Sequence, residues 1–176
     1  NDIVEHMSDI FKFPRTHHIC AVGKGSSITR DDLLMDKKFV KSTFLNGNTP
    51  IIVEEKIDGA NIGISIHKTG KIVAQNRSHY VTSESAQQFK ALQNWIDEMS
   101  SYLWEICSPN DHHGPRILFG EWCAALHSVE YNKLPGYFIA FDVFDIKDKK
   151  FLSITERNAI LNVTPIPIIH QVVSKP

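Results

Sequence analysis

The spacing of hydrophobic residues changes along the chain and separates strands from helices. Ile51-Ile52-Val53 is a short apolar run, and Ile62, Ile64 and Ile66 alternate with other residues, as in a strand that buries one face. Lys68-Thr69-Gly70 has the composition of a hairpin turn. The strands predicted from these patterns are at about residues 51–56, 61–67 and 71–76.

A helical period follows from Ser83 to Ile106, where apolar residues recur every three or four positions. The pattern predicts one long amphipathic helix with its aromatic residues in the core. Its apolar members are Phe89, Leu92, Trp95, Ile96, Met99, Leu103 and Ile106.

The last third of the chain returns to strand patterns. Residues 116–122 predict a strand, and 137–144 are apolar on both faces, which is typical of a central strand. Ser153 and Glu156 form a capping-box pattern for a helix to about Leu161, and the prolines within 165–169 favour a short edge strand. This order predicts an α+β fold with mostly antiparallel sheets and flanking helices.

Composition narrows the class of protein. The 176 residues suit a single domain, residues 1–176, and the net charge of −1 gives no global basic field for nucleic acid. Three widely separated cysteines without a C-x-x-C pair favour a reducing, intracellular compartment. No apolar run is long enough for a membrane span and no signal peptide is visible, although the chain opens at Asn1 rather than Met.

Candidate chemistry centres on residues 53–61, where Lys56 and Asp58 lie between two strand patterns and Gly59 suggests a close backbone approach. A lysine held there could act as a nucleophile, or it could be a solvated charge at a strand end. Gly23–Ser27 faintly resembles a phosphate loop but lacks the spacing of one, and a flexible loop is the alternative.

Four motifs occur in order: E-K-I-D-G-A-N at 55–61, N-R-S-H-Y at 76–80, F-G-E-W at 119–122 and Y-F-I-A-F-D-V-F-D at 137–145. Together they resemble the covalent nucleotidyltransferase superfamily, and most closely the ATP-dependent RNA ligases of the bacteriophage RNA ligase 2 type. F-P-R-T-H-H at 13–18 is similar to the opening of an RNA-ligase-like branch. The resemblance runs from about Phe11 to about His170 and implies an ATP-grasp-like ligase domain.

The resemblance implies a role for each motif residue. Lys56 would be the nucleophile that carries AMP. Glu55 and Asn61 would position adenine and ribose, while Asp58 and Gly59 would shape the turn beside the phosphate. The residues implied in the later motifs are Arg77 on the ribose and RNA end, Glu121 on a ribose hydroxyl and Phe141 stacked on adenine.

Each of the later residues also has a structural interpretation. Arg77 could be a solvated loop arginine, and Glu121, an acid within an apolar strand, could form a salt bridge. Phe141, taken alone, would be assigned to the core.

The chain departs from the family pattern in its last part. The family continues with an E-G-containing strand and a K-x-K element, but the chain has no Glu-Gly pair, and Lys147–Lys150 precedes the expected position. The resemblance therefore implies a nucleotidyltransferase domain that is incomplete at its C-terminus.

The implied activity is RNA ligation with ATP and Mg²⁺, which joins a 5′-phosphate to a 3′-hydroxyl through AMP on Lys56. The alternatives are a catalytically incomplete module that binds nucleotide or RNA, a DNA ligase, and a GTP-using capping enzyme.

Overall fold

A computed structural model describes residues 10–21, 33–124 and 137–175. The chain divides into two compact units. The sheet unit comprises Asn1–Lys12 and Lys56–Ile169, and the terminal-strand unit comprises Phe13–Glu55 and His170–Pro176. The possible phosphate loop at Gly23–Ser27 lies outside the described residues.

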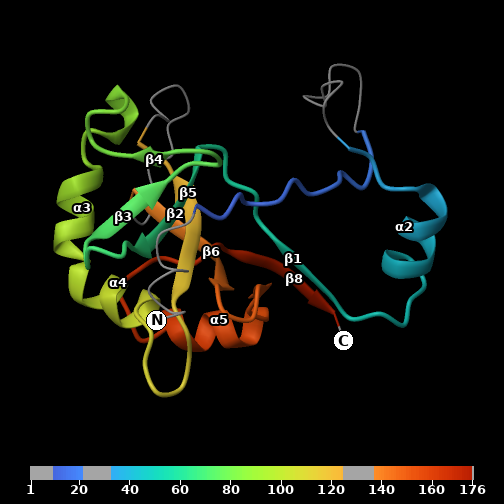
Figure 1. The fold of residues 1–176 in the computed structure, drawn as a ribbon. Helices are drawn as coiled ribbons and strands as arrows, with labels where there is room; N and C mark the ends of the chain where they lie inside the picture. Colours follow the sequence, from blue (N-terminus) through green and yellow to red (C-terminus); the bar gives the residue numbers. More distant parts are fainter. Residues whose placement is uncertain (1–9, 22–32, 125–136, 176) are drawn as a thin grey trace. The chain divides into compact units, whose positions relative to one another are not determined.

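The sheet unit contains an antiparallel sheet of six strands in the order β4-β3-β2-β5-β6-β7 (Figure 1). This arrangement confirms the predicted α+β class with antiparallel strands and flanking helices. The strands are β2 (Ala60–Ile66), β3 (Ile72–Gln75), β4 (Tyr80–Val81), β5 (Arg116–Trp122), β6 (Phe138–Asp145) and β7 (Lys150–Phe151).

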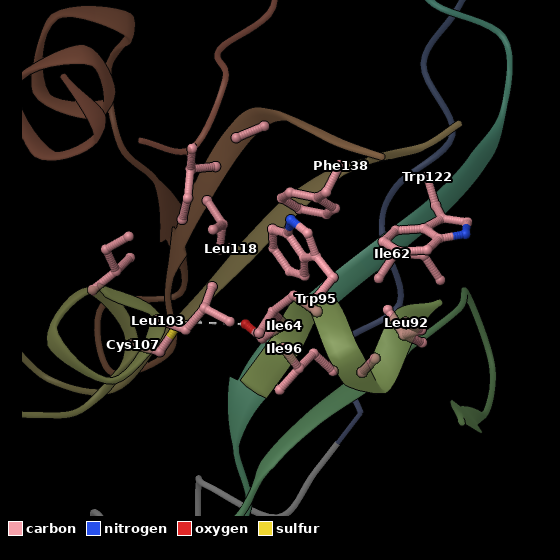
Figure 2. Close-up of a cluster of buried hydrophobic side chains, with 14 of the residues drawn as sticks. Ile62, Ile64, Leu92, Trp95, Ile96, Leu103, Cys107, Leu118, Trp122 and Phe138 are labelled. Atoms are coloured by element: carbon pink, nitrogen blue, oxygen red, sulfur yellow. Dashed lines mark hydrogen bonds between the residues drawn. The ribbon is translucent and has the colours of Figure 1, made fainter. Parts of the chain in front are cut away.

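One face of this sheet carries the main hydrophobic core. Ile62 and Ile64 of β2 point to the same face as Leu118 and Trp122 of β5, because alternate residues of a strand share a face. Trp95 packs on Phe138 there, with ring centroids 4.8 Å apart. Figure 2 shows this cluster between the strands and the helical segment.

The helical segment differs from the sequence prediction. Residues 83–106 do not form one helix: they form η1 (Gln87–Phe89), α3 (Leu92–Glu98) and α4 (Ser100–Cys107). Met99, between α3 and α4, departs from helical backbone geometry, with φ of −93° and ψ of 5°. The Ser83 hydroxyl accepts the Gln93 N–H (2.9 Å), which favours a helix that starts near this point rather than at Ser83.

The opposite face of the sheet carries a second group of aromatic rings. Phe11 stacks on Phe144 at a centroid distance of 3.8 Å and meets Phe119 edge-on at 6.2 Å. The side chain of Gln75, only 1 % exposed, donates to the Phe11 carbonyl (2.7 Å). The N-terminal segment at Phe11 thus covers part of this face.

The C-terminal part of the unit confirms one prediction and corrects another. Helix α5 (Ile154–Leu161) begins with the predicted capping box of Ser153 and Glu156. Residues 165–169 form no strand: Ile168 makes an isolated parallel bridge to Ala140, because the prolines at 165 and 167 have no N–H for a ladder. The Ala140 N–H donates to Pro167 (2.8 Å), and Ile169 donates back to Ala140 (2.9 Å).

The terminal-strand unit is smaller. Strand β1 (Ile51–Glu54) pairs in antiparallel fashion with β8 (Gln171–Lys175), a strand that the sequence patterns did not predict. Helix α2 (Lys37–Phe44) is capped by Asp36, whose carboxylate accepts the N–H groups of the first turn. Among the residues described in both units, no helix is both long and apolar enough to cross a membrane.

Candidate functional site

A row of three side-chain positions crosses the second face of the sheet. Glu121 in β5 is the register partner of Asn61 in β2 and of Ile139 in β6. Register partners in antiparallel strands present their side chains on the same face, so an amide and a carboxylate lie side by side here. The Asn61 side-chain oxygen is buried and has no hydrogen-bond partner. An acceptor left in this state has capacity for a ligand donor.

Gly59 is held against Glu121. Its backbone N–H donates to Oε1 of Glu121 (3.0 Å). A Cβ atom added to Gly59 would lie 2.5 Å from the Trp122 carbonyl oxygen and 3.0 Å from Cγ of Glu121, so only glycine fits at this approach. The structural reason for the glycine in the first motif is therefore its contact with the third motif.

Three further charges surround the Glu121 carboxylate. Partial burial raises its pKa above the usual glutamate range, and the repulsion from Asp58 adds to that effect. The Gly59 hydrogen bond and the positive charges of Lys56 and Arg77 act in the opposite direction. Residues of the first and second motifs are thus close enough to Glu121, in the third motif, to interact with its carboxylate.

Lys56 itself is exposed and belongs to no strand. Strand β1 ends at Glu54, two residues earlier than predicted, and residues 55–58 form an irregular connection to β2. The exposed position leaves the Lys56 amine accessible. Glu55 belongs to the terminal-strand unit, where its N–H donates to the His170 carbonyl (2.9 Å).

Arg77 lies at the tip of a tight turn between β3 and β4. The Asn76 side chain accepts the N–H groups of Ser78 (2.9 Å) and His79 (2.8 Å), and the Asn76 N–H donates to the His79 carbonyl (2.9 Å). Asn76 therefore fixes the turn, as asparagine does in many tight turns. The half-buried Arg77 is held by a short, ordered segment rather than by a long loop.

Phe141 lies at an irregularity of β6. Phe119 pairs with Asp142 while the next residue, Gly120, pairs with Ala140, so Phe141 is the extra residue of a β-bulge. Bulges change the direction of a side chain relative to the regular pleat. Half-buried Phe141 packs beside a small apolar cluster of Cys123, Ile139 and Ile169 on the same face as Glu121.

Two residues beside this site carried no predicted role. Arg157 in α5 is 2 % exposed and donates from Nη1 to the Phe141 carbonyl (2.7 Å). The Cys123 thiol donates to the Glu121 carbonyl (3.5 Å), and burial together with the Glu121 charge raises its pKa to about 11. Sequence patterns give no signal for Arg157, because an arginine in a short polar helix is typical of an exposed helix face.

The described residues offer no complete metal cage. Among them, no group of three or more histidine, cysteine or acidic side chains is arranged to hold a metal ion. Within the described residues, Asp58 is the acidic group whose charge acts on the Glu121 carboxylate. Mg²⁺ is commonly held by one or two carboxylates and by substrate phosphates, so this site fits a metal that arrives with a nucleotide.

Comparisons with known proteins identify the family to which the chain belongs. The model of the RNA ligase family matches residues 49–175, and the chain therefore belongs to the RNA ligase family. This result confirms the resemblance that the four motifs carry. No curated protein matches the chain.

Solved structures of RNA ligases share the fold. An archaeal ATP-dependent RNA ligase is 24 % identical over 72 % of this chain and 32 % of its own, with a TM-score of 0.54. A Naegleria gruberi RNA ligase with PPi is 18 % identical over 96 % of this chain and 49 % of its own (TM-score 0.56). An E227A mutant of the Naegleria enzyme with ATP and Mn is 19 % identical over 84 % and 44 %, respectively (TM-score 0.55). The chain thus spans between about a third and a half of the length of these proteins.

Proposed function

We propose that this chain is the part of an ATP-dependent RNA ligase that accepts AMP, with Lys56 as the nucleophile. The observation that carries the proposal is the convergence at Glu121: this carboxylate accepts the Gly59 N–H and interacts with the charges of Lys56 and Arg77. Residues from motifs that are distant in sequence thus lie near the exposed amine of Lys56. Membership of the RNA ligase family is consistent with that chemistry.

In the proposed reaction, the neutral Lys56 amine attacks the α-phosphorus of ATP. A P–N bond forms, the bond from the α-phosphorus to the bridging oxygen breaks, and pyrophosphate leaves with the electron pair of that bond. The nitrogen releases a proton to solvent, and AMP remains on Lys56 as a phosphoramidate. Covalent catalysis by lysine divides one difficult transfer into two easier ones.

The neighbouring residues suit the other parts of a nucleotide. In the proposal, the Glu121 carboxylate accepts a hydrogen bond from a ribose hydroxyl, and the unpartnered Asn61 oxygen accepts from a second donor of the ligand. The guanidinium of Arg77 binds a phosphate or the RNA end, because its planar donors match phosphate oxygens. Phe141 stacks on adenine, and Glu55 and Asp58 border the nucleophile.

The second half of the proposed reaction joins RNA ends. AMP passes from Lys56 to a 5′-phosphate, and a 3′-hydroxyl then displaces it to form the phosphodiester. Mg²⁺ bound to the phosphates would neutralise their charge. Three free cysteines fit the reducing interior of a cell, which we propose as the location.

The test is formation of an AMP adduct by the protein at its natural length. Incubation with ATP and Mg²⁺ should add one AMP to the intact mass, and Lys56→Ala should abolish the addition. Lys68→Ala, at an exposed lysine in the β2–β3 turn, is the matched control and should retain it. Absence of the adduct from the wild-type protein would contradict the proposal, and ATP binding without an adduct would support a module that only binds nucleotide.

Parallel reactions separate the related enzymes. We expect ATP and not GTP to form the adduct, since a GTP adduct would indicate a capping enzyme. We also expect sealing of a nicked RNA duplex that carries a 5′-phosphate and a 3′-hydroxyl. Sealing of nicked DNA alone would indicate a DNA ligase.

A further inference from the structure

The β-bulge in β6 interrupts the regular register with β5 at one residue. Phe119 pairs with Asp142 and Gly120 with Ala140, so Phe141 is the extra residue of the bulge. A backbone carbonyl in a buried region needs a hydrogen-bond donor, and the carbonyl of this residue accepts from a side chain. Here the donor comes from outside the sheet.

That donor is Arg157 of α5. Its Nη1 donates to the Phe141 carbonyl at 2.7 Å, and the side chain is 2 % exposed although it carries a permanent charge. The guanidinium is held in turn by Asn158, whose Oδ1 accepts from Nε (3.1 Å) and Nη2 (2.9 Å). The α5 helix that presents both residues begins at the capping box of Ser153. A series of hydrogen bonds thus leads from Asn158 through Arg157 to the backbone of Phe141.

We propose that Arg157 is a positioning residue, which sets the direction of the Phe141 ring for a purine base by fixing its carbonyl. This inference rests on the proposed function, because it assigns Phe141 to the base of the nucleotide. The effect of Arg157 passes through Phe141, so it concerns the base of the ligand and not its phosphates. A selective effect on binding of the base distinguishes this role from that of an arginine that only stabilises the core.

The test measures binding of two ligands to the protein at its natural length. ATP contains the base, whereas inorganic tripolyphosphate contains only the phosphates. Arg157→Lys keeps a charge but loses the planar fork, and we expect it to weaken ATP binding about tenfold while tripolyphosphate binding changes less than about twofold. Asn158→Ala, which leaves the arginine in place, should show a smaller loss with the same selectivity. Arg116→Lys on β5 is the matched control, and it should leave the ratio of the two affinities unchanged.

A double-mutant cycle identifies the route of the effect. With Phe141→Ala as background, Arg157→Lys should cause almost no further loss of ATP affinity, because the residue through which it acts is gone. Additive losses, equal losses for both ligands, or an unchanged ATP affinity in a folded Arg157→Lys protein would each overturn the inference. If Arg157→Lys does not fold, Asn158→Ala decides by the same criteria. Failure of the proposed function has a different signature: the wild-type protein would then bind no ATP, and the inference would fall with it.

Discussion

The backbone N–H of Gly59 donates to the carboxylate of Glu121, 62 residues later in the sequence, at a distance of 3.0 Å. This bond joins the segment that contains Lys56 to the strand that contains F-G-E-W. It also explains two features at once: why a glycine follows Asp58, and how an acid is accommodated in an otherwise apolar strand. The acid is compensated by a backbone donor and by neighbouring positive charges.

The first prediction concerns the pH dependence of stability in Glu121→Gln. Folding raises the Glu121 pKa, mainly through burial, so the protonated acid contributes stability below its ordinary value of 4.5, and this contribution is lost as pH rises through the folded-state pKa. Gln should therefore raise the Tm relative to wild type more at about pH 8 than at about pH 4. Because solvent still reaches the carboxylate, we expect a gain of at most about 3 °C.

Thermal unfolding of both proteins across this pH range is the measurement. Glu105→Gln, at an exposed position of α4, controls for the loss of one negative charge. A Tm difference that shrinks as pH rises would contradict the environment that we describe for Glu121.

The second prediction separates function from stability at Asn61. The Asn61 oxygen is buried without a partner, so Asn61→Leu removes an acceptor that makes no hydrogen bond within the folded chain. We expect the Tm to stay the same or to rise, while ATP affinity falls about tenfold because one hydrogen bond to the ligand is lost. Calorimetric titration and thermal unfolding of the same sample give both values. A large loss of stability with unchanged affinity would show that Asn61 serves the fold instead.

The third prediction concerns Gly120, which permits the close packing beside the bulge. A Cβ atom at this position would lie 2.4 Å from the Phe138 ring and 2.6 Å from the Ile139 carbonyl oxygen. Gly120→Ala should therefore lower the free energy of unfolding by about 2–3 kcal/mol, as overpacked cores do. Urea denaturation gives the value, and a change below about 0.5 kcal/mol would argue against this packing.

The fourth prediction concerns the three cysteines. Cys107 is buried and donates to the Ile64 carbonyl (3.4 Å), and burial raises its pKa to about 12 (Figure 2). Burial also raises the pKa of Cys123, to about 11, whereas Cys20 is exposed. A thiol reagent at about pH 8 should therefore label one cysteine in the native protein and three in denaturant. Rapid labelling of native Cys20→Ser would contradict the burial of the other two thiols.

The sequence patterns predicted strands at the positions of β1, β2, β3, β5 and β6, but not β4, β7 or β8. Strand β5 has the predicted bounds of 116–122, and α5 starts at the predicted capping box. The prediction of one long helix was wrong because the hydrophobic period of three to four residues continues across the one-residue break at Met99. Period alone therefore cannot distinguish one helix from two consecutive helices on the same core face.

The motifs identified the residues of the candidate site, but they did not predict its geometry. The spacing of Lys56, Arg77 and Glu121 along the chain gives no information on their convergence, which depends on the register of β2 on β5 and on the turn at Asn76. The bulge at Phe141 and its support by Arg157 depend on contacts between distant segments. Local patterns do not encode such contacts, and the roles of these residues stay predictions.

The position of AMP on the chain would show whether Lys56 is the nucleophile. After reaction with ATP and Mg²⁺, proteolysis under mildly alkaline conditions and peptide mass spectrometry would locate the adduct, since a phosphoramidate is labile in acid. We expect AMP on the peptide that contains Lys56, in a wild-type protein that also seals RNA. AMP on another lysine, or an unmodified Lys56 in a protein that seals RNA with ATP, would contradict it.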